Sequence, residues 1–198
     1  MNYQNKLMEI INNLDKRPKL LLHSCCGPCS TAVLSFLVPY FDITVLYYNP
    51  NIEPIEEYLK RKNEQIRFIK EYKHDNIDFL DCDYDNETFK SRVKGLEKEK
   101  EGGARCPVCY RLRLEYTAIK AKELGYDYFG TTLTVSPYKH SKTINEIGES
   151  LEKEYGINFL YSDFKKKDGY KKSIEMSKEY NLYRQDYCGC LYGKDNHE

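Results

Sequence analysis

The sequence predicts an α/β protein built on an open parallel sheet of about five strands, with helices on both of its faces. Short apolar runs alternate five times with longer amphipathic stretches, at the spacing of βαβ units. Proline or glycine stands where most of the expected helices begin or end. A length of 198 residues suffices for one well-filled core, so we expect residues 1–198 to form a single domain. Its end, residues 181–198, is expected to be an irregular segment, which we call the C-terminal tail.

In the first half of the chain the pattern predicts three strands and four helices. Leu7, Ile10, Ile11 and Leu14 recur at helical spacing and predict an amphipathic helix over residues 2–15. Apolar runs predict buried strands at residues 19–22, 43–48 and 77–80. Helical spacing predicts further helices at residues 28–39, 54–72 and 86–94, and Pro28 suits the first turn of the earliest of them.

The second half begins with a charged, glycine-containing stretch, residues 95–104, which has the composition of a mobile loop or flap. After it we expect helices at 107–124, 142–155 and 171–180, and strands at 126–132 and 157–161. Gly125 and Gly156 are placed to end the first two of these helices. Because the carboxyl ends of parallel strands meet at one edge of a sheet, we expect a ligand site in the loops at that edge.

Charge and hydropathy exclude several classes of protein. Lys and Arg number 31, as do Asp and Glu, so any nucleic-acid contact needs a local basic patch. No stretch approaches the roughly 18 apolar residues of a membrane span. Residues 1–15 are polar and lack the apolar region of a signal peptide. We therefore expect a cytoplasmic protein with no membrane partner, whose eight cysteines serve a metal or redox chemistry.

Two cysteine pairs stand where helices begin. Cys25 and Cys26 follow the first strand, and Cys106 and Cys109 open a later helix. A helix N-terminus favours the thiolate that a metal needs. Four thiols ligate either an iron–sulfur cluster or zinc, so the pattern alone leaves both open. Cys29 is a fifth thiol beside the first pair, and it fits a second metal, catalysis or simple packing equally.

The remaining cysteines differ in kind. Cys188-Gly189-Cys190 permits a strained disulfide, which is easily reduced and suits a dithiol that passes two electrons. The same pair also fits extra metal ligands or a structural role. Cys82, at the end of an expected strand, is interpreted as a buried thiol.

Basic and aromatic residues recur around the expected ligand edge. Three arginines flank the second cysteine pair and would offset the charge of a thiolate-bound cluster: Arg105, Arg111 and Arg113. Basic runs at residues 139–140, 165–167 and 171–172 alternate with tyrosines such as Tyr138 and Tyr170, a combination suited to phosphates and stacked bases. Each run taken alone is more typical of a solvated helix face.

Six ordered motifs together resemble the cobalamin-independent family of epoxyqueuosine reductases. The motifs are Leu22-His-Ser-Cys-Cys-Gly-Pro-Cys29, Tyr47-Tyr-Asn-Pro-Asn-Ile52, Arg105-Cys-Pro-Val-Cys-Tyr-Arg-Leu-Arg113, Gly130-Thr-Thr-Leu-Thr-Val-Ser-Pro-Tyr-Lys139, Asp163-Phe-Lys-Lys166 and Tyr183-Arg-Gln-Asp-Tyr-Cys-Gly-Cys190. The match runs from about Leu20 to Cys190, nearly the whole chain.

The resemblance implies an oxidoreductase that reduces the epoxide of epoxyqueuosine, at the wobble position of tRNA, to queuosine. It implies a nucleotide-hydrolase-like (HUP or Rossmann-like) fold and a [4Fe–4S] cluster held by Cys25, Cys26, Cys106 and Cys109. It further implies a redox-active disulfide between Cys188 and Cys190, and no cobalamin. A second iron beside the cluster is compatible with the family, with Cys29 as its candidate ligand. The partners would be the anticodon loop of tRNA and an unidentified electron donor.

The proton donor is not identified by the motifs. Tyr110, His23 and Asp186 are hypotheses that rest on proximity in the sequence alone.

Two other functions remain open at this point. An ATP-dependent tRNA-modifying enzyme of the pyrophosphatase-loop type would carry a serine-glycine-glycine loop after its first strand. Here Ser24-Cys25-Cys26-Gly27-Pro28 occupies that place, which argues against phosphate binding. A zinc-stabilised RNA-binding module would contain zinc without colour, and its Cys188 and Cys190 would be dispensable.

Overall fold

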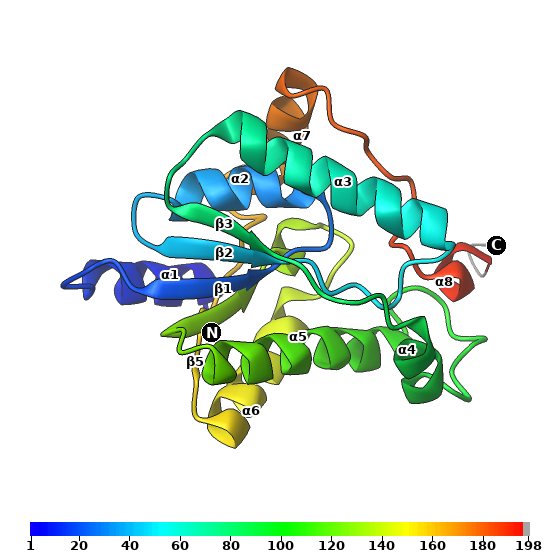
Figure 1. Ribbon diagram of the computed structural model, residues 1–198. Coiled ribbons are helices and arrows are strands. Elements are labelled where there is room, and N and C mark those ends of the chain that lie inside the picture. Colours follow the sequence, from blue (N-terminus) through cyan, green and yellow to red (C-terminus); the bar gives the residue numbers. More distant parts are fainter. Residues whose placement is uncertain (196–198) are drawn as a thin grey trace.

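The computed structural model, which describes residues 1–195, contains an open sheet of five parallel strands with helices on both faces (Figure 1). The strand order is β3-β2-β1-β4-β5. The strands are β1 (Lys19–His23), β2 (Asp42–Leu46), β3 (Ile77–Leu80), β4 (Tyr128–Thr131) and β5 (Asn158–Phe159). The fold class predicted from the alternating pattern is confirmed, and the order is that of a Rossmann-like sheet.

Strand β1 lies at the centre, between β2 and β4, and is apolar because both of its faces are covered. Its three leucines alternate between two cores. Leu20 and Leu22 join the core on one side of the sheet, whereas Leu21 joins the core on the other side. The order of the sheet changes direction at β1, which makes its carboxyl end the expected ligand position.

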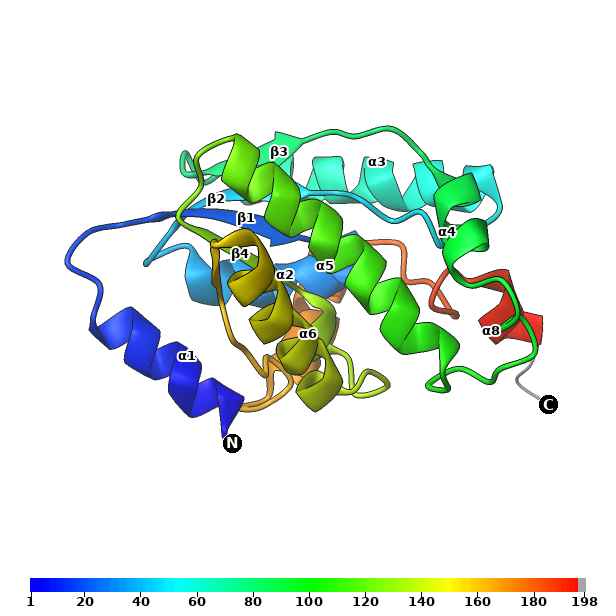
Figure 2. The same cartoon turned by 90° about the horizontal axis from the view of Figure 1, so that it is seen from below.

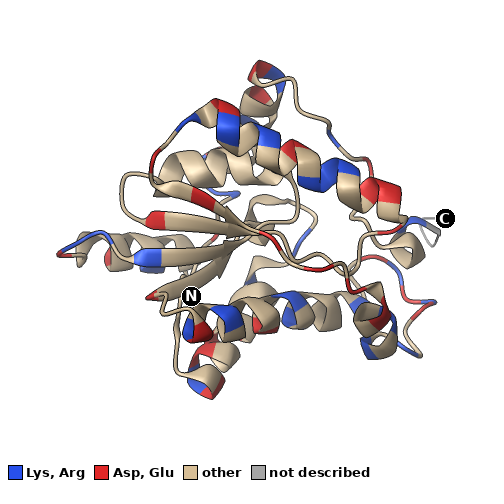
Figure 3. Ribbon diagram, viewed as in Figure 1, with Lys and Arg blue, Asp and Glu red and all other residues tan. Residues whose placement is uncertain are grey.

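The helices form two layers. α2 (Gly27–Leu37), α3 (Ile55–Tyr72) and α7 (Gly169–Glu179) cover one face, and α5 (Arg105–Glu123) and α6 (Ser141–Tyr155) cover the other (Figures 1 and 2). The remaining helices are α1 (Tyr3–Asn12), α4 (Asn86–Arg92), the 3₁₀ helix η1 (Leu133–Val135) and α8 (Leu191–Asp195). Charged residues of both signs are scattered over the helices (Figure 3). Within residues 1–195, no helix has the length and apolar character needed to cross a bilayer.

Two expectations about individual elements need correction. The C-terminal tail is not irregular throughout, because residues 191–195 form helix α8; residues 196–198 lie outside the described part of the chain. The fifth strand is only two residues long, Asn158–Phe159, and pairs with Tyr128 and Phe129 of β4. Residues 95–104 form a series of turns with hydrogen bonds from the Arg105 side chain to the carbonyl oxygens of Leu96, Glu97 and Glu99, and their role as a mobile flap stays a prediction.

Helix α6 packs directly on β5 through a glycine. A methyl group at Gly148 would overlap the ring of Phe159, which is fully buried. Overpacking of this kind typically costs about 1–3 kcal/mol, so Gly148→Ala should lower the free energy of unfolding by that amount. Urea denaturation measures the change, with the exposed Ser150→Ala on the same helix as control. Equal stability of the two variants would contradict this packing.

Candidate metal and redox site

All eight cysteines are free thiols, and all eight belong to the same core. Four of them are buried members of the apolar cluster beneath α5 and α6: Cys25, Cys26, Cys109 and Cys190. The other four are partly buried and pack against that cluster: Cys29, Cys82, Cys106 and Cys188. All eight thiols thus contact one core, although Cys29 also packs against the core on the other face of the sheet. Two groups can be distinguished among them.

The first group is the trio of Cys25, Cys26 and Cys29, formed where β1 passes into α2. Cys26 is the N-cap of α2, and its sulfur accepts a hydrogen bond from the backbone N–H of Cys29 at 3.4 Å. The Sγ atoms of Cys25 and Cys26 are 3.8 Å apart, and the three sulfur atoms all lie within 4.8 Å of one another. The trio is therefore close enough to bind one metal ion.

The trio contains one favoured thiolate. Thiol hydrogen bonds from Cys26 and Cys29 hold the pKa of Cys25 well below its usual value, with help from the charges of Lys139 and Arg113. Burial raises the pKa of Cys26 to about 12, and hydrogen bonding to its neighbours holds the pKa of Cys29 well above its ordinary value. A deprotonated ligand is thus available beside two neutral thiols.

The second group lines a pocket of about 350 Å³, its open mouth included. Cys106 and Cys109 reach it from the first turn of α5, and Cys188 and Cys190 reach it from the C-terminal tail. Burial raises the pKa of Cys109 and Cys190, and raises that of Cys188 to about 11. The sulfur of Cys106 accepts the backbone N–H of Gly102 at 3.1 Å. This group brings both sequence pairs, C-x-x-C and C-x-C, to one place.

Beside Arg105, two further cations, Arg113 and Lys139, line the same pocket and link the two groups. Burial opposes their charges, but thiolate charge at Cys25 and Cys188 raises the pKa of both side chains, and Cys109 adds to the effect at Arg113. Neither cation forms an ion pair with a carboxylate in the described residues 1–195, and one carboxylate, that of Glu101, lines the pocket. A buried cation without an acidic partner needs nearby negative charge, which a set of thiolates provides.

These features fit a thiolate-bound metal centre. The donors are sulfur atoms, the surroundings are apolar, and the excess positive charge matches the negative charge of thiolate ligands. Among residues 1–195, the trio is the group whose ligand atoms already lie within 4.8 Å of one another. The set Cys25, Cys26, Cys106 and Cys109 does not form such a group in the structure, and its role as a ligand set stays a prediction.

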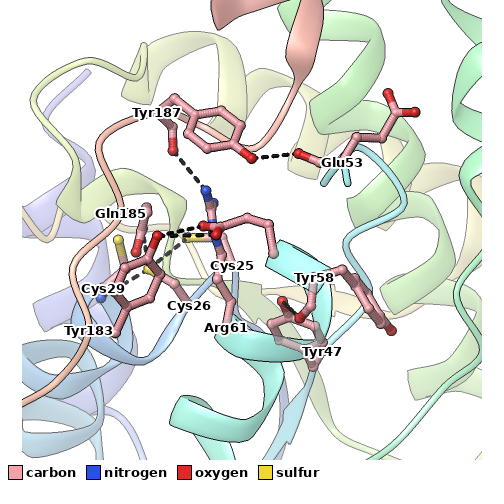
Figure 4. A network of polar contacts seen from close by, with 11 residues as sticks. Cys25, Cys26, Cys29, Tyr47, Glu53, Tyr58, Arg61, Tyr183, Gln185 and Tyr187 are labelled. Atoms are coloured by element: carbon pink, nitrogen blue, oxygen red, sulfur yellow. Dashed lines mark hydrogen bonds and ion pairs between the residues drawn. The ribbon is translucent and has the colours of Figure 1, made fainter. Parts of the chain in front are cut away.

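Helix α3 anchors the C-terminal tail over the site (Figure 4). The buried Arg61 pairs with Glu57 at 2.7 Å and donates a hydrogen bond to the carbonyl oxygen of Tyr187 at 3.1 Å. Tyr183 donates from its hydroxyl to the same Glu57 carboxylate. Gln185 reaches further in, and its Nε2 donates to the sulfur of Cys26 at 2.9 Å. The tail therefore touches the trio directly as well as supplying the second group.

Gly189 lets the tail turn between its two thiols. Its φ of 106° lies in the region that favours glycine. A methyl group there would also stand 2.7 Å from the Ile52 side chain and 3.2 Å from the Arg61 guanidinium. Close contact with the loop after β2 is completed by the N–H of Glu53, which donates to the carbonyl of Gly189 at 2.9 Å. Glycine is thus required here for both conformation and space.

Comparison with known proteins places the chain in a family. The family model described as epoxyqueuosine reductase QueH matches residues 20–196. Curated proteins named epoxyqueuosine reductase QueH are similar over most of their length. The Streptococcus pyogenes protein is 45% identical over 198 residues, which cover 97% of this chain and 78% of that protein. The Staphylococcus epidermidis protein is 44% identical over 200 residues (97% and 84%), and that of Thermotoga maritima 35% over 176 residues (87% and 88%). The chain belongs to the epoxyqueuosine reductase QueH family.

The family resemblance drawn from the six motifs is thereby confirmed.

The structure distinguishes among the three residues that the sequence suggested as proton donors. His23 is fully buried, and burial lowers its pKa to about 3, so its ring is neutral. Its Nε2–H donates to the carbonyl of Tyr48 at 3.0 Å, and its Nδ1 accepts from the Thr131 hydroxyl at 3.0 Å. Both nitrogens are therefore engaged in joining β1 to its neighbours. Asp186 is exposed and does not line the pocket.

Tyr110 is the one hypothesis of the three that lines the pocket. Burial raises the pKa of its hydroxyl to about 12, so the proton stays on the oxygen at neutral pH. Cys82, interpreted from the sequence as a buried thiol, is only partly buried; its sulfur donates to the carbonyl of Tyr47 at 3.0 Å, and desolvation raises its pKa to about 12.

Some of the residues around the site were not singled out from the sequence. Arg61 belongs to a helix with many charged residues, and nothing in the sequence distinguishes this buried arginine from the solvated side chains around it. Gln185 carries no signal of its own. Asn51, which is 2% exposed and lines the pocket, stands inside a recognised motif but was not identified as a site residue. Arg111, expected near the thiols, instead pairs with Glu154 at 2.6 Å on the surface.

Proposed function

We propose that this protein, as an oxidoreductase of the QueH family, reduces the epoxide of epoxyqueuosine at the wobble position of tRNA to queuosine. The observation that carries the proposal is the meeting of the C-x-x-C and C-x-C thiols in one pocket that is also lined by Arg113 and Lys139, neither of which pairs with a carboxylate within residues 1–195. Family membership supplies the substrate, because the relatives are named for it.

In this proposal Cys25, Cys26, Cys106 and Cys109 hold a [4Fe–4S] cluster, and Cys29 is the candidate ligand of a second iron. The cluster, when bound, would supply one-electron transfer and Lewis acidity toward oxygen. Arg113 and Lys139 would stabilise the thiolate charge of the ligands in an apolar surrounding.

The dithiol of Cys188 and Cys190 balances the reaction. Conversion of an epoxide to an alkene breaks two C–O bonds, consumes two electrons and two protons, and releases water. Oxidation of the two thiols to a disulfide forms one S–S bond and yields two electrons and two protons. One dithiol therefore accounts for one turnover, and a separate electron donor must reduce the disulfide before the next. Tyr110 is positioned to deliver a proton from its hydroxyl.

Single-turnover kinetics test this proposal. Anaerobic, reduced, metal-loaded protein freed of external reductant should convert about one epoxyqueuosine per chain in an anticodon stem-loop RNA, with loss of two titratable thiols. Cys188→Ser and Cys190→Ser should convert none while keeping the iron and sulfide content of the wild type. Full conversion by either variant would remove the dithiol from the reaction, whereas no conversion by loaded wild-type protein would contradict the function itself.

A cytoplasmic location belongs to the same proposal. The proposed substrate is tRNA, and a free dithiol that cycles with its disulfide requires the reducing conditions of the cytoplasm. The partners would be tRNA, through its anticodon loop, and the electron donor.

A further inference from the structure

Tyr138 is the only exposed tyrosine of the 19 in the chain, all of which the structure describes. Its exposed fraction is 76%, against partial or complete burial for the other 18. Among the large apolar residues, the few others that are exposed are aliphatic. An aromatic ring left in water contributes nothing to the core, and exposed rings of this kind commonly serve in binding.

The backbone holds this ring on a rigid turn. Ser136 to Lys139 form a β-turn in which the N–H of Lys139 donates to the carbonyl of Ser136 at 3.3 Å, and Pro137 fixes the dihedral angle at the second position. The N–H of Tyr138 donates to the Ser136 hydroxyl at 3.3 Å. Lys165 fastens the far side through its Nζ, which donates to the carbonyl of Lys139 at 3.3 Å and to the hydroxyl of Ser141 at 3.2 Å. The turn therefore fixes the backbone at Tyr138 without a ligand.

The turn stands at the edge of the thiol pocket. Lys139, the residue directly after Tyr138, lines that pocket, whereas Tyr138 itself remains in solvent. Basic side chains lie along the segments that meet at the turn. Lys142, whose side chain is 72% exposed, pairs with Glu146 at 3.8 Å and lines a surface hollow together with Lys166 and Asp163. A ring beside a pocket and among lysines suits a nucleic-acid strand, which offers phosphates and base faces together.

We infer that Tyr138 is a stacking platform for a base of the anticodon loop next to the nucleotide that enters the thiol pocket. This inference rests on the proposed function and adds to it the position of a second, unreacting base. Stacking is indifferent to base identity, because every base has an aromatic face. A ring held on a rigid turn loses little conformational freedom on binding, so most of the stacking energy is kept as affinity.

A double-mutant cycle between protein and RNA tests the contact. The RNAs are an epoxyqueuosine anticodon stem-loop and two versions with an abasic nucleotide directly 5′ or directly 3′ of the modified one. Tyr138→Ala should weaken binding of the intact RNA by about 10-fold, Tyr138→Leu by a similar factor, and Tyr138→Phe by less than about 2-fold. One of the abasic RNAs should show the same loss with wild-type protein, and no additional loss with Tyr138→Ala.

Leu124→Ala is the matched control, because Leu124 is 54% exposed at the far end of α5. Iron and sulfide content, measured for every variant, should not change. The inference would be overturned if wild-type protein and Tyr138→Ala bound intact RNA with equal affinity. It would also be overturned if the losses in affinity from Tyr138→Ala and from the abasic nucleotide were fully additive for both abasic RNAs. In either case, turnover by wild-type protein would still support the proposed function. Failure of loaded wild-type protein to bind any of the RNAs would overturn both.

Discussion

Serine in place of Cys106 or Cys109 is expected to remove acid-labile sulfide from anaerobically prepared protein and to abolish epoxide reduction. Both cysteines stand in the first turn of α5, where they line the thiol pocket beside Arg113. A [4Fe–4S] cluster has one thiolate on each iron, and serine oxygen is a poor replacement for sulfur at such a site. Iron, sulfide and EPR measurements on wild type and variants provide the readout.

Three further variants make this experiment specific. Cys25→Ser or Cys26→Ser should behave like Cys106→Ser, whereas Cys82→Ser, whose thiol donates to a carbonyl oxygen, should keep full sulfide content. Cys29→Ser should lower iron without lowering sulfide, as expected for a ligand of a second iron. Loss of all metal in Cys29→Ser, with full retention in Cys106→Ser, would instead assign the metal to the trio. Zinc without sulfide in the wild type would favour the zinc-stabilised RNA-binding module.

Loss of the Arg61 side chain is expected to release the C-terminal tail from α3. The guanidinium is 2% exposed and joins Glu57 to the carbonyl oxygen of Tyr187, so Arg61→Ala leaves a largely buried carboxylate without its cation. Breaking a buried pair in this way costs roughly 3–5 kcal/mol. If that cost falls on tail docking, alkylation of Cys188 and Cys190 should accelerate by about 100-fold or more, since reaction follows the open population. Peptide mapping after iodoacetamide pulses measures the rates.

Controls separate tail release from general unfolding. Arg17→Ala removes a half-exposed arginine, paired with Asp42 at 3.8 Å, and should change neither alkylation rate. Gly189→Ala should accelerate alkylation as Arg61→Ala does, because its methyl group would overlap Ile52. Alkylation of Cys82, a thiol that lies outside both the tail and the thiol pocket and donates to the carbonyl oxygen of Tyr47, reports general unfolding and should stay slow in all three variants. Unchanged reactivity of the tail thiols in Arg61→Ala would show that α3 does not hold the tail.

The architecture was predictable because burial on both sides of a parallel sheet is visible in the sequence. The side chains of Leu20, Leu21 and Leu22 alternate between the two faces of a strand, so their burial needs a core on each face of the sheet. The structure contains both cores. The N-terminal ends of α2 and α5 were also predictable, because Pro28 and the cysteines mark them in the sequence. The lengths of β4 and β5 were not, because the extent of a strand depends on its pairing with segments that are distant in the sequence. Helix α8 is too short to show a periodic pattern.

Within the site, motif spacing in the sequence identified the functional residues better than it identified the contacts that these residues make. Arg111 and Arg113 were equivalent in the sequence, yet two positions on a helix differ by about 200° in direction, so only one of them faces the thiols. Arg113 lines the pocket and Arg111 lies on the surface. Cys29 lies with Cys25 and Cys26 because all three occupy the start of one helix, a consequence of local geometry. The contacts between α3 and the tail join segments that are more than 100 residues apart in the sequence, so no local sequence pattern predicts them.

The anchoring of the tail on α3 has a consequence for the order in which the site is assembled during synthesis. Every sheet strand, and the helix that holds the tail, precede Cys188 and Cys190 along the chain. The trio, Cys106 and Cys109 can therefore take up their places while the segment that will cover them has yet to leave the ribosome. A metal centre can be loaded from solution at this stage, and closure of the last segment then seals it in.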